Sequence, residues 1–173
     1  MADETPGRKD GEDAGTLSTH AMDQLAAALA HPDQPQATLA AIDHIGRDAV
    51  GHCLFSANAF RVETMEVERL YSSNPGAYPV GGRKHKKLTA WGAQVLLDRR
   101  VFVGDGDQAI REFFDDHALM RGLGVHSIVN VPVVWRGACL GVLNFAGPHP
   151  RFEAGQIAMA RMLGLVAVAA FLQ

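Results

Sequence analysis

The chain has 173 residues, of which 47% are hydrophobic and 20% are charged, and its formal net charge at pH 7 is -3. Its length and composition are those of one globular domain with a sizeable core, and the weak negative charge excludes a general attraction to nucleic acid or to an anionic membrane. Cys53 and Cys139 stand in apolar runs outside any CxxC motif, so we expect a reduced, cytoplasmic protein. Residues 1–16 are polar and lack the apolar core of a secretory signal, and we expect a flexible tail before a domain at 17–173.

Two amphipathic helices are expected at the start of this domain. Apolar residues recur every four positions from Leu17 to Leu29, and the His31-Pro32 pair ends that helix. A second helix follows Pro35, which suits a first helical turn. Residues 53–60 and 65–73 then have the composition of two short strands around a polar turn.

A long loop and short helices are expected in the middle of the chain. Residues 74–88 hold two prolines and three glycines among Tyr, Arg, Lys and His, and long loops in compact domains usually serve a function. A short helix at 90–97, a strand at 101–103 and one helix over 108–124 should follow. In the helix over 108–124, the residues that we expect to face inward are Ile110, Phe113, Phe114, Leu119 and Met120.

The most informative stretch is "SIVNVPVVWRGACLGVLNFAGP", residues 127–148, which predicts a hairpin of two apolar strands. With 136–137 as a two-residue turn, Asn130 lies opposite Leu143 and shares a face with Gly141. Small and polar residues on one face make that face a candidate floor for a pocket. A bulge at the turn would shift one strand by a residue and exchange its faces.

The last helix is expected at 153–172, and every residue from Met162 to Leu172 is apolar or glycine. That run is too short to span a bilayer, which needs roughly 20 such residues. A helix that is apolar all round is buried on more than one side. We therefore expect it to pack on the sheet and to join the first helix in a homodimer.

The stretch "GLGVHSIVNVPVVWRGACLGVLNFAGP" followed by a C-terminal helix resembles the end of a GAF domain, and the upstream order of elements is similar over residues 17–173. The resemblance implies an α+β, GAF/PAS-like fold. In it an antiparallel sheet carries the N- and C-terminal helices on one face and a ligand pocket, with short helices and loops, on the other. GAF domains bind cyclic nucleotides, bilins, haem, amino acids and other small molecules, and many are dimerising regulatory modules.

The pocket is expected between the hairpin face of Asn130 and a lid formed by residues 78–91 and 113–120. The basic run at 81–87 is either a solvated loop or an anion site, and as a site it favours an anionic ligand. No histidine stands at metal-ligand spacing from a cysteine or another histidine, so no metal is predicted, and the sequence identifies no cofactor. The expected ligand-binding residues are Tyr78, Arg83, Lys87, Trp91, Phe113, His117, Asn130 and Leu143.

Three functions remain open. The favoured one is a non-catalytic sensor that binds a small molecule and signals through a partner or through its own dimerisation. A GAF-type enzyme such as free methionine-(R)-sulfoxide reductase needs loop cysteines, and residues 89–95 and 113–124 contain none, so no catalytic residue is predicted. A pure dimerisation module is the third.

Overall fold

The computed structural model describes residues 17–86 and 89–172, so the expected tail at 1–16 lies outside the described residues. The helices are α1 (Thr19–Ala30), α2 (Gln36–Ala49), α3 (Ala90–Gly92), α4 (Gly106–Phe113), α5 (His117–Gly122) and α6 (Ala154–Phe171), and a π-helical segment η1 (Ala93–Leu97) continues α3. The strands are β1 (Leu54–Arg61), β2 (Glu66–Ser72), β3 (Arg83–His85), β4 (Phe102–Asp105), β5 (Ser127–Trp135) and β6 (Ala138–Gly147).

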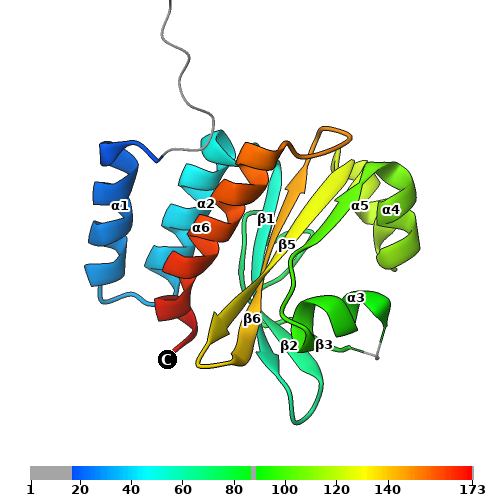
Figure 1. The fold of residues 1–173 in the computed structure, drawn as a ribbon, viewed down its shortest axis with the longest axis horizontal. Helices are drawn as coiled ribbons and strands as arrows, with labels where there is room; N and C mark the ends of the chain where they lie inside the picture. The colour runs from blue at the N-terminus through cyan, green and yellow to red at the C-terminus, as the bar shows by residue number, and fades with distance from the viewer. Residues whose placement is uncertain (1–16, 87–88, 173) are drawn as a thin grey trace, which may run out of the picture.

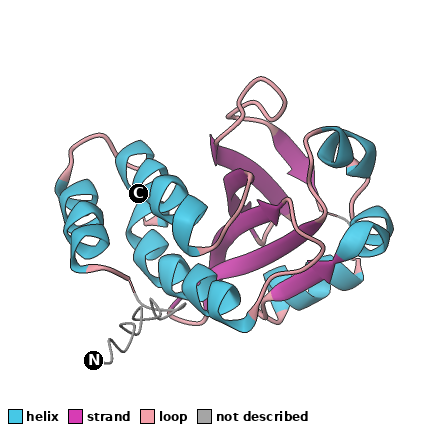
Figure 2. Ribbon diagram, turned by 90° about the horizontal axis from the view of Figure 1, so that it is seen from above, coloured by secondary structure: helices cyan, strands magenta, loops and turns pink. Residues whose placement is uncertain are grey.

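The strands form one antiparallel sheet in the order β3-β2-β1-β6-β5-β4. Helices α2 and α6 cover one face, and α1 packs against α2 on the outside of that layer (Figure 1). The short helices α3, α4 and α5 lie on the opposite side of the sheet (Figure 2). The predicted α+β arrangement is confirmed.

The termini of the long helices follow from local hydrogen bonds. The Ser18 hydroxyl accepts from the amide of Ala21 at 3.1 Å and caps α1. Helix α6 begins with a reciprocal capping box between Glu153 and Gln156. Each cap satisfies amide groups that have no partner inside the helix, which fixes where the chain enters each helix.

Two expectations about the connections are wrong. Within the expected loop at 74–88, residues 83–85 form the edge strand β3 and pair with β2. The single helix expected over 108–124 is two helices, α4 and α5, separated by residues 114–116. Leu119 consequently lies on the exposed side of α5 and not in the core.

The β5–β6 hairpin has the predicted turn but a different register. Arg136 and Gly137 both adopt positive φ, 49° and 80°, as a two-residue type I′ turn requires, and Trp135 pairs with Ala138. A bulge between Val133 and Val134 then shifts the pairing by one residue.

The bulge exchanges the two faces of β6. Asn130 pairs with Asn144, and Leu143 pairs with Val131. Leu143 is therefore packed in the core under α2 and α6, and its expected place on the pocket side is wrong. Gly141 lies on the helix side too, where an added Cβ would collide with Phe171 and with the Asn58 carbonyl oxygen.

Helix α6 packs against β5 and α2 along one side only. Gly164 brings the helix against β5, since a Cβ there would lie 2.7 Å from Val131 Cγ1. On the uncovered side, Leu165 is 75% exposed and Met162 is 45% exposed. Among the described residues, α6 is the one helix long and apolar enough to cross a membrane by length and composition, and a third of it is buried inside the fold.

A polar cluster is buried in the helix-side core. The Asp43 carboxylate accepts from Tyr71 Oη at 2.9 Å and from Arg47 Nη2 at 3.3 Å, and His52 Nε2 lies 2.9 Å from its other oxygen. Because an ionised carboxylate only accepts, Nε2 of His52 is the donor in this contact. Burial alone would raise the pKa of Asp43, but hydrogen bonds from His52, Tyr71 and Arg47 hold it below its usual value.

Candidate ligand-binding site

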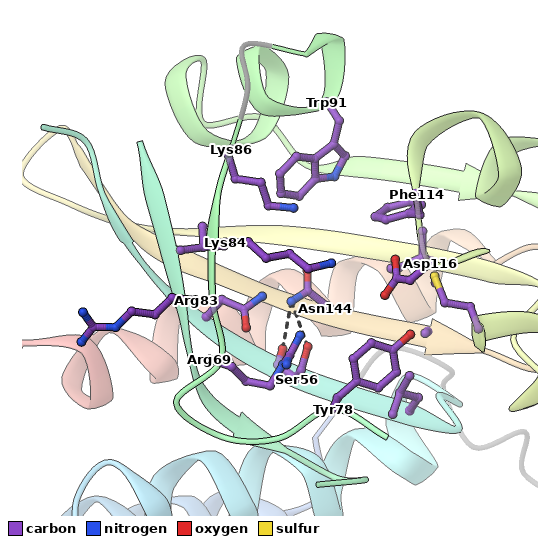
Figure 3. A pocket seen from close by; sticks show the side chains of 17 residues that line it. Ser56, Arg69, Tyr78, Arg83, Lys84, Lys86, Trp91, Phe114, Asp116 and Asn144 are labelled. Atoms are coloured by element: carbon purple, nitrogen blue, oxygen red, sulfur yellow. Dashed lines mark hydrogen bonds between the residues drawn. The ribbon is translucent and has the colours of Figure 1, made fainter. Parts of the chain in front are cut away.

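A cleft of about 160 Å³ lies on the side of the sheet that carries the short helices. Ser56, Asn58 and Asn144 contribute to its floor from β1 and β6, Trp91 lines it from α3, and Phe114 lines it from the segment between α4 and α5 (Figure 3). The volume is close to that of an engineered cavity of about 150 Å³ that binds benzene. The cleft can hold a compact metabolite.

Arg83, the expected anion-binding arginine, forms ion pairs on the face of β3 that points away from the cavity. Its guanidinium lies 2.9 Å from the Glu68 carboxylate and 3.8 Å from that of Glu66, and it points away from the cavity (Figure 3). The residue borders the cavity, but these glutamates already neutralise its charge.

Different cations line the cavity because strand residues alternate between faces. Lys84 pairs with Val67, which is buried on the cavity side. Lys84, Lys86 and Arg69 all line the cavity. Within the described ranges, none of these three is within 4.0 Å of a carboxylate.

The environment of these cations is partly apolar. Lys86 Nζ lies 4.6 Å from the centre of the Trp91 ring, and the Arg69 guanidinium lies 5.0 Å from that of Tyr78. Burial lowers the pKa of Lys86, and the charge of Lys84 lowers it further, while Asp116 opposes both. Burial also lowers the pKa of Arg69. An anion in the cavity would relieve this repulsion among like charges.

A chain of hydrogen bonds joins Trp91, Asn144 and Ser56 of the cavity lining through Asn130, which lies behind them. Trp91 Nε1 donates to Asn130 Oδ1 at 2.8 Å, and Asn130 Nδ2 donates to Asn144 Oδ1 at 2.7 Å. Asn144 Nδ2 donates in turn to Ser56 Oγ at 3.1 Å. The chain ties the helix α3 to three adjacent strands and fixes the orientation of each amide.

Three buried polar atoms of cavity residues have no hydrogen-bond partner among the described residues: Asn58 Oδ1, Arg69 Nε and Tyr78 Oη. Burial raises the pKa of Tyr78, and the negative charge of Asp116 raises it further, so the phenol keeps its proton. Each unpartnered buried group costs about 1–3 kcal/mol of folding free energy. Native proteins rarely keep such groups without a water or ligand partner.

The cavity brings together only part of the expected site. Tyr78 and Trp91 line it. Asn130 lies on the expected face but behind the wall, where it is fully buried and bonded to Trp91 and Asn144. Lys87 lies outside the described residues.

Two residues from the expected lid lie elsewhere. The Phe113 ring packs against Phe102 at 4.9 Å between ring centres, and the neighbouring Phe114 lines the cavity instead. His117 borders a separate hollow of about 20 Å³ beside Asp107. The break between α4 and α5 turns these side chains away from the positions that a single helix would give them.

The comparisons with known proteins agree with this architecture. A family model, the GAF domain, matches residues 13–171. The chain belongs to the GAF domain family. No curated protein sequence matches it.

Solved structures share the fold of this GAF domain at low sequence identity. The GAF domain of a phosphoenolpyruvate-protein phosphotransferase from Acinetobacter is 14% identical, with a TM-score of 0.65 over 90% of this chain and 94% of that one. The corresponding domain from Coxiella burnetii is 13% identical, with a TM-score of 0.68 over 87% and 90%. Residues 122 to 287 of a methyl-accepting chemotaxis protein are 15% identical, with a TM-score of 0.64 over 85% and 94%.

The thiols of this GAF domain stand apart from the cavity. Although both cysteines stand in apolar runs of the sequence, Cys53 is exposed just before β1 and Cys139 is half-buried on β6. Desolvation raises the pKa of both thiols, which disfavours the reactive thiolate. In the part of the chain that is described, no group of three His, Cys, Asp or Glu side chains could hold a metal ion.

Five polar residues of the cavity lining were not predicted from the sequence, namely Ser56, Asn58, Arg69, Asp116 and Asn144, whereas Lys84 and Lys86 belong to the basic run at 81–87 that was expected as a possible anion site. A signal existed for Arg69. It follows Val67 by two positions in a predicted strand, so the two side chains share one face. Val67 indicates that this face is buried, and a charged residue is rarely buried unless it has a partner.

Proposed function

We propose that this GAF domain is a non-catalytic regulatory module that binds a small anionic molecule in the cleft above β1, β2 and β6. The observation that supports this proposal is that one cavity holds both cations without a carboxylate partner and buried polar atoms without a hydrogen-bond partner. Three cations, Arg69, Lys84 and Lys86, have no carboxylate partner among the described residues, and three buried polar atoms there have no hydrogen-bond partner. An anionic ligand with donor and acceptor groups would supply both.

A regulatory role is supported by the solved proteins that share this fold. GAF domains of two phosphotransferases and a segment of a chemotaxis protein share it. The raised thiol pKa values argue against cysteine-based catalysis. The two unbridged cysteines agree with the cytoplasmic location that we infer.

The test is a thermal-shift screen of small carboxylates, phosphates and sulfate, followed by calorimetric titration of each compound that stabilises the protein. Arg69→Gln should weaken binding of a hit about 10- to 100-fold, because a buried charged hydrogen bond is worth about 1.5–3 kcal/mol. Arg83→Gln is the matched control, since Arg83 borders the same cavity but pairs with Glu68, and it should change affinity less than about threefold.

Two results would contradict the proposal. One is a screen in which no anion raises the melting temperature. The other is a hit whose affinity falls equally in Arg69→Gln and Arg83→Gln, because the cavity cations would then have no special part in binding.

A second function, dimerisation through the terminal helices, is favoured by the uncovered side of α6. Leu165, at 75% exposed, and Met162 stand there on a helix whose other side is packed. Isologous pairing of two such helices would remove both residues from water. Sedimentation velocity at tens of micromolar should give a dimer, and Leu165→Glu should give a folded monomer. Val62→Glu, at an exposed site in the β1–β2 turn, should leave the dimer intact; a monomeric wild type would overturn the idea.

A further inference from the structure

The charges around the cavity are arranged unevenly. Arg69, Lys84 and Lys86 come from β2, β3 and the residue after β3, whereas Asp116 stands across the cavity beside the hydroxyl of Tyr78 (Figure 3). Asp116, like the three cations, forms no ion pair within the described residues. The cavity therefore has a cationic side and a smaller anionic side.

The balance of charge limits what fits. Three cations face one carboxylate, which leaves a surplus of two positive charges. A ligand with two anionic groups would match the cationic side. A purely anionic ligand would place one end against Asp116 and the buried phenol of Tyr78, where a cationic donor is favoured instead.

The buried atoms without hydrogen-bond partners favour the same combination, a ligand with both acceptor and donor groups. Arg69 Nε is a donor and needs an acceptor oxygen, such as that of a carboxylate, while Asn58 Oδ1 is an acceptor and needs an N–H or O–H. Tyr78 Oη can accept from such a donor. An ammonium group supplies three N–H donors, and a carboxylate supplies acceptors only.

We infer that the cavity takes an acidic α-amino acid, with its two carboxylates toward Arg69, Lys84 and Lys86 and its ammonium toward Asp116 and Tyr78. The inference rests on the proposed function, because it names the ligand class of the same cavity. The volume of about 160 Å³ suits a compact ligand of this kind. Trp91, Phe114 and Ile128 line the remaining wall and can pack against the methylene groups of the ligand.

The experiment compares four probes by isothermal titration: L-glutamate, L-aspartate, glutarate and L-glutamine. Glutarate lacks the ammonium, and L-glutamine lacks the second carboxylate. One of the two acidic amino acids should bind the wild-type protein at least about tenfold more tightly than either comparison compound, since each loses one charge-assisted contact.

Asp116→Asn separates the ammonium contact from the rest. The variant should bind the acidic amino acid about tenfold more weakly and should bind glutarate as well as the wild type or better, because a negative charge facing the glutarate is removed. Arg69→Gln should weaken both probes, and Arg83→Gln should weaken neither. Circular dichroism and thermal unfolding of each variant establish that it is folded.

The outcomes distinguish the inference from the proposed function. If glutarate or another anion binds with dependence on Arg69 while neither acidic amino acid binds more tightly, the inference is wrong and the proposed function stands. Equal weakening of glutamate and glutarate by Asp116→Asn would also overturn the inference. If none of these probes and no anion of the wider screen binds, both are wrong.

Discussion

The buried Asp43 cluster gives the sharpest stability prediction. Asp43→Asn keeps the shape of the side chain but replaces one acceptor oxygen by an NH₂ group, which faces a donor from either His52 or Tyr71 at a contact of 2.9 Å. Losing one hydrogen bond to a buried charged acceptor costs about 1.5–3 kcal/mol, and the unpartnered donor adds to that cost. Arg47 is half exposed, and its pair contributes less than about 1 kcal/mol. We expect a loss of about 2–4 kcal/mol in the free energy of unfolding.

Urea unfolding followed by Trp fluorescence measures this loss, with Arg47→Gln as the control on the same carboxylate. The pH dependence is a second readout. Because the pKa of Asp43 is lowered in the folded protein, its contribution is complete above the unfolded value of 3.8 and is lost as the pH falls through the folded value. The difference between wild type and Asp43→Asn should therefore shrink below about pH 4. Equal losses for Asp43→Asn and Arg47→Gln at pH 7 would refute the reasoning.

Three further predictions concern the sheet and the thiols. Gly141→Ala should destabilise the protein by at least about 2 kcal/mol in urea, because the added methyl group would collide with Phe171 and the Asn58 carbonyl; a neutral effect would show that β6 can move. Trp91→Phe leaves Asn130 Oδ1 without its donor and should cost about 1–3 kcal/mol, and a loss near zero in the same assay would mean that the amide finds another partner. The double variant with Cys53→Ser and Cys139→Ser should leave ligand binding unchanged; a methionine sulfoxide reductase activity present in the wild type and absent from this variant would contradict a non-catalytic role.

The order of the helices and strands could be predicted from the sequence, because each periodic pattern lies within a single segment of the chain. Leu17 to Leu29 repeats with the period of a helix, and residues 136–137 have the composition of a tight hairpin turn. Each of these signals needs only the residues of its own segment, and the fold class came from the resemblance of residues 122–148 to the end of a GAF domain.

The cavity lining was harder to predict because it depends on register between segments. The bulge between Val133 and Val134 moved Leu143 to the helix side and Asn144 to the cavity side. The pairing of β3 with β2 decided that Lys84 lines the cavity while Arg83 pairs with glutamates. A shift of one residue reverses such an assignment, and the residue composition of a loop says nothing about the strand with which it pairs.

Strand β5 carries Asn130 on its cavity side and Val131 on its helix side. Asn130 holds Trp91, while Val131 sits against the bare backbone of Gly164 in α6. A single peptide unit of β5 thus separates the polar wall of the cleft from the contact with α6. Because Asn130 and Val131 are adjacent in an interior strand, we expect a displacement of the Trp91–Asn130 contact to reach the contact of β5 with α6 directly.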